Sequence, residues 1–325
     1  MKPIISYLAK NQFVAALAIL AVILLAIQIK DILVVIFISF ILMAALQPAV
    51  RFLETKKLPR ALAASIVYIV LIACILLLVV PIMPFFVSQV QNLIVNFPMY
   101  FEKAAGTLGF HIKYSNINSQ AASLGSLGTS IFLITSTVFG GIVSFFTILV
   151  ISFYLLLSHD HFEKLILEFF PREARLKTKE VFNEIEIKLG NWVRGQLILS
   201  LSVGLISYIF LQLLGVPYAF PLAFIAALFE AVPMIGPVLG SIPAIIVALT
   251  VSPSLAMAVT AGSFVIQGIE NNVFYPKIME KAVGLNPVVT IIAILVGGSL
   301  LGIWGALISI PFLTMVVLIL IALND

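Results

Sequence analysis

Long apolar runs, separated by short polar segments, dominate the chain from end to end. The first half contains four such runs, at 13–29, 32–50, 61–87 and 131–157. A helix that crosses a bilayer needs about 20 mostly apolar residues. The pattern therefore predicts an all-α, polytopic transmembrane protein whose N-terminal region, 1–87, holds spans joined by an inner basic loop.

Two segments have an amphipathic pattern instead. In 88–130, apolar residues recur at helical spacing in the first half, and Gly, Ser and Asn dominate the second half. In 158–194, seven basic and seven acidic residues accompany an apolar stripe at helical spacing. Because such a helix has one apolar and one polar face, we expect an outer amphipathic segment and loop at 88–130, and an inner amphipathic helix at 158–194 beyond the span at 131–157.

The C-terminal region, 195–325, is predicted to be a transmembrane transport core with broken helices. Its stretch 220–269 carries one charge, Glu230, and is interrupted by Pro221, Pro233, Gly236, Pro237, Gly240, Pro243 and Pro253. One helix over this range would be about 75 Å long, too long for a single crossing of about 30 Å. We therefore expect short, broken or re-entrant helices here. Two further spans in 282–324, with a break between Gly297 and Gly305, bring the prediction to about seven to eight spans.

Composition supports a membrane location and argues against a soluble protein and a nucleic-acid-binding protein. The chain is 62% apolar and 10% charged, with a mean hydropathy of +1.22, whereas a typical soluble domain is about 25% charged. The net charge of +4 would suit nucleic acid, but an inner N-terminus places 15 of the 18 Lys and Arg residues inside and 3 outside. Since membrane proteins keep their basic loops in the cytoplasm, we expect both termini there, lipid as the surroundings and no nucleic-acid partner.

Glu230 and the break that follows it form the first candidate site. A carboxylate within an apolar span is costly and points to function, and Pro233, Gly236 and Pro237 would expose carbonyls or helix ends to a substrate or ion. If it is desolvated, Glu230 can carry a proton. The alternatives for Glu230 are a position at the membrane surface or a helix-capping contact, and the alternative for the break is a kinked packing helix that binds nothing.

Two other polar groups stand at the ends of apolar runs. Glu270, Asn271 and Asn272 would gate or coordinate a substrate at the inner mouth, unless they only mark an aqueous boundary. Arg194, Gly195 and Gln196 stand where the inner helix enters the lipid. There we expect Arg194 to anchor at the headgroups and Gln196 to bond a neighbouring helix.

Enzyme chemistry has no visible place in this sequence. His159 and His161 are two residues apart and do not share a helix face, and Cys74 is the single cysteine. We therefore expect no metal site and no cofactor. Zinc-protease, nucleotide-binding and serine-hydrolase motifs do not occur in the sequence, so it predicts a protein that is not an enzyme.

Several ordered motifs of the second half carry a family resemblance. They are RGQ at Arg194, Gly195 and Gln196; GVPYA with Gly215 and Pro217; P-x-x-G-P at Pro233, Gly236 and Pro237; and Q-x-x-E-N…P-K at Gln267, Glu270, Asn271, Pro276 and Lys277. With the C-terminal glycines and prolines they cover 190–315 and resemble the autoinducer-2 exporter family. The resemblance implies a bacterial inner-membrane permease that exports small molecules such as this quorum-sensing signal. It also implies a homo-oligomer, with a pentamer as the form to test.

Three hypotheses follow. The first is a secondary transporter that exports a small polar solute, with proton coupling through Glu230. The second is a sodium (lithium)/proton antiporter, as some relatives in the family look to be, using Glu230 and Glu270. The third is a membrane scaffold whose outer segment 88–130 and inner helix 158–194 dock partners.

Overall fold

A computed structural model describes residues 20, 24, 25, 28–107, 127–233, 235–279 and 286–324. Every regular element within these residues is helical, which confirms the all-α prediction. The first predicted apolar run, 13–29, lies almost wholly outside the described residues, as does most of the predicted loop in the second half of 88–130.

Helices long and apolar enough to cross a membrane recur along the described chain. Four pass by length and composition, within 30–55, 60–77, 172–213 and 288–323. A fifth candidate combines the end of one helix with the next across a 79° bend, and two shorter apolar helices follow later in the chain. These features confirm a polytopic helical membrane protein with broken helices in its C-terminal half.

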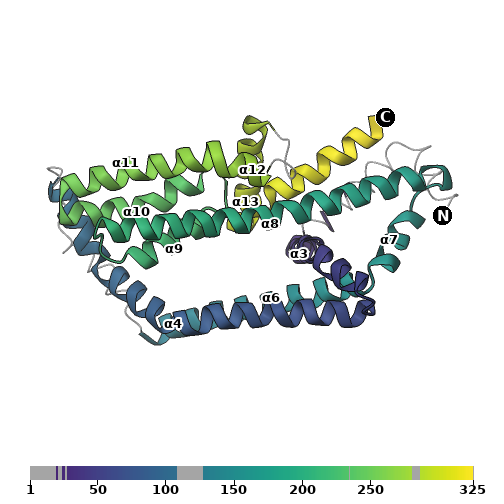
Figure 1. Cartoon of the computed structure of the whole chain (residues 1–325), viewed down its shortest axis with the longest axis horizontal. Helices are drawn as coiled ribbons and strands as arrows, with labels where there is room; N and C mark the ends of the chain where they lie inside the picture. Colours follow the sequence, from purple (N-terminus) through teal and green to yellow (C-terminus); the bar gives the residue numbers. More distant parts are fainter. Residues whose placement is uncertain are drawn as a thin grey trace.

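The long helices form two layers that meet at both ends (Figure 1). In one layer α4 packs beside α6, and in the other α8 packs beside α9, α11 and α13. α4 rises at one end to contact α9 and α10, and α3 joins α6 to α8 near the other end. The bounds of these helices are α3 Lys30–Thr55, α4 Arg60–Thr107, α6 Leu127–Leu157, α8 Arg175–Leu213, α9 Ala219–Phe229, α10 Gly236–Val251, α11 Pro253–Ile269 and α13 Pro287–Asn324.

α4 is a single long helix that passes through three prolines, Pro81, Pro84 and Pro98. It continues beyond residue 87, where the apolar run ends, as far as Thr107. In a transmembrane helix the backbone groups that a proline frees can find other partners in neighbouring helices. The boundary drawn at residue 87 from the sequence therefore coincides with a change of polarity and not with the end of a helix.

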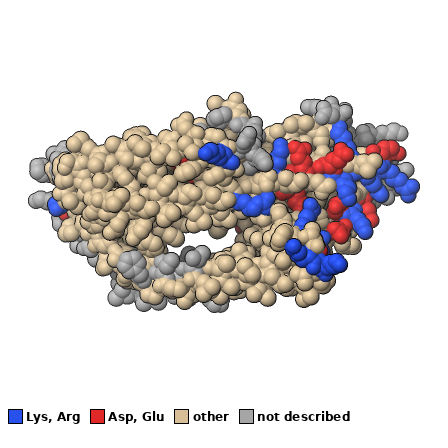
Figure 2. All heavy atoms as spheres, in the orientation of Figure 1, with Lys and Arg blue, Asp and Glu red and all other residues tan. Residues whose placement is uncertain are grey.

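The predicted inner amphipathic segment forms the charged end of the molecule. It contains α7 His159–Glu168, the short 3₁₀ helix η1 Arg172–Ala174 and the first half of α8. The apolar stripe of α8 is buried at Phe182, Ile185, Leu189 and Trp192, as its helical spacing predicts. Figure 2 shows Lys, Arg, Asp and Glu gathered at this end, while apolar and uncharged residues cover most of the remaining visible surface.

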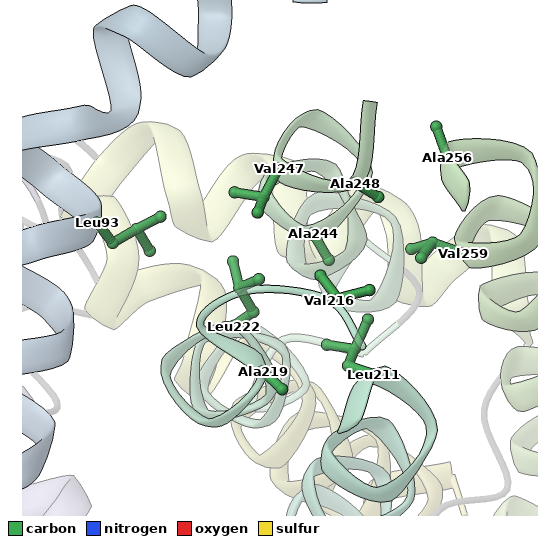
Figure 3. Packing of buried hydrophobic residues seen from close by; sticks show 10 residues of the cluster. All are labelled: Leu93, Leu211, Val216, Ala219, Leu222, Ala244, Val247, Ala248, Ala256 and Val259. Carbon is green, nitrogen blue, oxygen red and sulfur yellow. The ribbon is translucent and has the colours of Figure 1, made fainter. Parts of the chain in front are cut away.

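The C-terminal half contains the short helices that its prolines and glycines predict. α9, α10 and α11 are followed by a π-helical turn, η2 Glu270–Phe274, and by α12 Tyr275–Met279. Ten small and branched apolar side chains form a buried cluster in this half (Figure 3). They come from α4, from the end of α8 and the turn after it, and from α9, α10 and α11. Ala219, Ala244, Ala248 and Ala256 are among them, and such small residues let membrane helices approach closely.

α13 contains the break that was predicted between Gly297 and Gly305. Gly302 has a φ of 63°, so the helix bends there into two arms. Gly297 and Gly305 lie so close that a Cβ on either would clash with the backbone of the other. The glycines therefore allow two apolar spans to fold back against each other.

Candidate functional site

The broken helices bring two acidic side chains together inside the molecule. Glu230 follows α9 and is 0% exposed, and Glu270 follows α11 and is 4% exposed. Their carboxyl groups lie close enough for the charge of one to affect the other. In the described part of the protein, neither carboxyl oxygen of Glu230 has a hydrogen-bond partner with good geometry. The sequence singled out both residues but gave no indication that they meet.

Gln196 connects α8 to the break beside this acid pair. Its Nε2 donates a 2.6 Å hydrogen bond to the backbone carbonyl of Glu230. That carbonyl lies just beyond the end of α9, where backbone carbonyls need partners from outside the helix. Gln196 Oε1 is buried without a partner in the described residues. The predicted bond between Gln196 and a neighbouring element is thus present, and it holds the broken backbone.

The break itself is a tight turn in which Gly236 is essential. A Cβ at Gly236 would collide with the backbone carbonyl of Phe229 and approach Glu230 Cα to 3.1 Å. Pro237 stands in the first turn of α10, where a missing N–H is harmless, and Pro233 is buried. The backbone N–H of Ile235 donates to the Pro233 carbonyl across 2.9 Å. The motif therefore closes the backbone around Glu230.

A small cavity lies beside Glu270, one member of the acid pair. Its volume is about 40 Å³, and Glu270, Gln267, Pro237 and Gly240 contribute to its lining. Three hydroxyl-bearing residues also line it, Ser207, Ser241 and Ser263. Apolar side chains form most of the remaining lining. A space of this size, with these few polar groups, has room for water or a small cation. It does not have room for an organic solute in this conformation.

Two other pairs of candidates from the sequence do not join the acid pair. Asn271 and Asn272 are next to Glu270 in sequence but face outward, and Gly215 and Pro217 lie far from it. Asn271 and Asn272 are exposed, and Asn272 Nδ2 donates to the Gly268 carbonyl at 2.7 Å. Gly215, with a φ of 68°, and Pro217 form the turn after α8. That turn is about 28 Å along α8 from Gln196 at the rise of a helix.

Arg194 and Gly195 fix α8 against its neighbours. Arg194 Nη1 donates to the Ala45 carbonyl of α3 at 2.7 Å, and Nη2 donates to Asn191 Oδ1 at 2.7 Å. A Cβ at Gly195 already reaches 3.0 Å from Met279 Sδ, so α12 packs tightly there. Arg194 thus bonds protein backbone, where the sequence suggested an anchor at the headgroups.

An ion pair at the charged end was missed by sequence reasoning. His159 Nε2 lies 2.8 Å from Glu186 Oε2, and both side chains are buried. The two residues come from α7 and α8, and no pattern in the sequence connects them. Within the residues that the structure describes, no group of three metal-binding side chains occurs, and His159 is engaged by this carboxylate.

This ion pair makes stability depend on pH in a defined direction. The hydrogen bond that His159 Nε2 donates to the Glu186 carboxylate, opposed by burial, raises the pKa of His159 above its usual value of 6.5. Because the pKa is higher in the folded state than in the unfolded state, the pair contributes its full stabilisation below pH 6.5. That stabilisation is lost as the pH rises through the pKa of the folded state. We expect the thermal unfolding midpoint of the purified protein to fall over that window.

Glu186→Gln is the matched variant for this prediction. It keeps the shape of the side chain but removes the negative charge that favours the imidazolium. The fall in unfolding midpoint above pH 6.5 should become shallower in the variant. Identical pH profiles for the two proteins would show that the His159–Glu186 pair does not control stability.

Comparison with known proteins agrees with this architecture. The sequence matches the model described as "AI-2E family transporter" over residues 13–325. "Putative transport protein YrrI" of Bacillus subtilis is 27% identical over an alignment of 297 positions that covers 87% of this chain and 84% of that protein. "AI-2 transport protein TqsA" of Escherichia coli is 25% identical over an alignment of 334 positions that covers 97% of this chain and 93% of that protein. These names indicate a transporter rather than an enzyme, and they favour transport over a scaffold.

The family match extends over nearly the whole chain, and the apolar helices are those of a multi-pass protein of the bacterial inner membrane. The resemblance drawn from the motifs of the second half is therefore confirmed. This chain belongs to the AI-2E family of transporters.

Proposed function

We propose that this permease exports a small polar solute and couples its movement to protons through Glu230 and Glu270. The observation that carries the proposal is the burial of two interacting carboxyl groups at a helix break. Two negative charges at close range in a low-dielectric site repel each other, so the pair is most stable when at least one carboxyl group is neutral. A pair that holds a proton can release it when the site opens to water.

The choice of solute rests on the relatives. One of them is named an AI-2 transport protein, which supports autoinducer-2 as the first solute to test. The 40 Å³ cavity is too small for such a molecule, so in this proposal the site must open during transport. Alternating access of that kind is usual where discontinuous helices form the site.

Orientation and assembly are also part of the proposal. The gathering of charged residues around α7 and the first half of α8 supports a cytoplasmic location for that end. Both termini are then cytoplasmic. We propose a homo-oligomer, with a pentamer as the expected form, and native mass spectrometry of the detergent-solubilised protein measures its subunit number.

A sodium or lithium/proton antiporter is the second candidate, and the small cavity favours it. Glu270, Gln267 and the three serines supply oxygen ligands in a space that fits a cation. In this alternative Glu230 and Glu270 exchange protons for the cation at one site. The two candidates therefore share the acid pair and differ in cargo.

Proteoliposomes separate the two candidates. Purified protein is reconstituted, a pH gradient is imposed, and uptake of autoinducer-2 is compared with uptake of lithium. Accumulation of autoinducer-2 that disappears with the gradient supports the exporter, and lithium uptake alone supports the antiporter. If neither cargo moves and a panel of small polar solutes also stays outside under every gradient, the proposed function is wrong.

A further inference from the structure

A second, much larger cavity opens at the charged end of the molecule. Its volume is about 810 Å³, and it lies among α3, the start of α4, α7 and α8. The charged side chains around it belong to the cluster seen in Figure 2. A cavity of this volume accommodates a small organic molecule. Except for Arg194, none of its lining residues was used above for the candidate transport site.

The acidic residues of this cavity are already neutralised. Lys179 Nζ lies 2.6 Å from Glu163 Oε1, and Arg60 Nη1 lies 3.6 Å from Asp160 Oδ1. The third acid, Glu186, has His159 Nε2 at 2.8 Å. Each carboxylate on the lining thus has a basic partner, although one oxygen, Glu186 Oε1, is buried without a hydrogen-bond partner in the described residues.

Two guanidinium groups of the same lining have no carboxylate partner among the described residues. Arg51 is exposed and takes part in no hydrogen bond or ion pair there. Arg194 gives hydrogen bonds only to backbone carbonyls and to Asn191. The cavity therefore has positive charge in excess, in the form of side chains that bind carboxylate and phosphate groups well.

Gln47 is the independent observation that points to a ligand. It is 4% exposed and lines the cavity, yet neither Nε2 nor Oε1 has a hydrogen-bond partner in the described part of the protein. Buried amides are almost always hydrogen-bonded, because an unpaired one loses its hydration without compensation. A ligand with acceptor and donor atoms would satisfy both ends of this side chain.

We propose that this cavity binds a molecule through a phosphate or carboxylate group, with Arg51 and Gln47 as ligand contacts. Where the transported solute carries such a group, the cavity is its cytoplasmic entry site, and in that part the inference rests on the proposed function. Arg194 lines the cavity, and Gln196 two residues later bonds the Glu230 carbonyl. One segment of α8 therefore connects the anion site to the acid pair.

Binding is measured without transport, so its failure is distinct from failure of the proposed function. The full-length protein in phosphatidylcholine nanodiscs is titrated with sodium phosphate and with sodium malonate, against sodium chloride at equal ionic strength. A ligand that binds the folded state raises the thermal unfolding midpoint in a saturable manner. We expect such a rise for at least one of the two anions.

Arg51→Gln and Gln47→Leu should each weaken the apparent affinity about tenfold, since each removes a hydrogen bond to a charged group. Gln47→Leu removes an unpaired buried amide, so the variant without ligand should unfold at the wild-type temperature or higher. Arg172→Gln, an exposed arginine of η1 outside the cavity, is the control and should bind as the wild type does. The proposal is overturned if both anions act like chloride, or if Arg51→Gln binds with wild-type affinity.

Nanodiscs that contain phosphatidylglycerol identify the source of the anionic group. If this lipid raises the unfolding midpoint of the wild type but not of Arg51→Gln, and removes the response to added anion, the site holds a lipid headgroup. If the response to added anion persists, the site takes a soluble solute. Either result supports binding of an oxyanion in the cavity.

Discussion

Glu230→Gln is expected to reduce proton-driven transport by about 100-fold or more, the scale on which a positioned acid or base contributes to proton transfer. The amide has nearly the same volume and fits the fully buried site, but it cannot take up and release a proton. It also removes the repulsion between Glu230 and Glu270, so the variant should fold. The measurement is initial uptake of the identified solute into proteoliposomes under an imposed pH gradient.

Glu173→Gln is the control for this prediction. Glu173 is an exposed acid on η1, far from the helix break in sequence, and its loss should leave uptake at the wild-type rate. Exchange of solute across the vesicle membrane is also measured for Glu230→Gln at equal pH on both sides. Exchange that persists shows that the variant still binds the solute and has lost only its coupling to protons. A Glu230→Gln protein that still concentrates solute at the wild-type rate would show that Glu230 is not the coupling group.

Gly236→Ala is expected to destabilise the protein by about 1–3 kcal/mol, the usual cost of forcing extra atoms into a tightly packed place. The added Cβ would collide with the Phe229 carbonyl, which is backbone and cannot rotate away. The turn that holds Glu230 must then open. The measurement is the thermal unfolding midpoint in detergent, which should fall clearly below that of the wild type.

Gly268→Ala is the matched control on the neighbouring helix α11. No atom lies within 4 Å of a Cβ built at Gly268, and alanine favours a helix over glycine by about 0.5–1 kcal/mol. This variant should unfold at the wild-type temperature or above it. Equal unfolding midpoints for Gly236→Ala and Gly268→Ala would contradict the close packing at the break.

The sequence predicted those features that depend on local pattern. Apolar runs of sufficient length became α3, α6 and α13, and the apolar stripe of 158–194 became the buried face of α8. The prolines and glycines of 220–269 became the breaks around α10. Each of these follows from side chains within a few residues of one another. The same reasoning found Glu230 and Glu270, because isolated charges within apolar runs are conspicuous.

Contacts between distant helices could not be predicted in this way. Gln196, Glu230 and Glu270 come together because α9 and α11 each pack against α8, and no spacing within one helix encodes that packing. The His159–Glu186 pair was missed for the same reason. Asn271 and Asn272 were expected beside Glu270, but successive residues in a helix point about 100° apart. With Glu270 buried, these two amides face outward.

The proposed coupling is tested most directly by measuring proton movement itself. Vesicles that contain the protein and a pH-sensitive dye are given a gradient of the transported solute with no initial pH difference. We predict that the wild type changes the internal pH as solute moves, and that the double variant Glu230→Gln, Glu270→Gln does not. Wild-type solute flux with no pH change, or an unchanged pH response in the double variant, would contradict proton coupling through this pair.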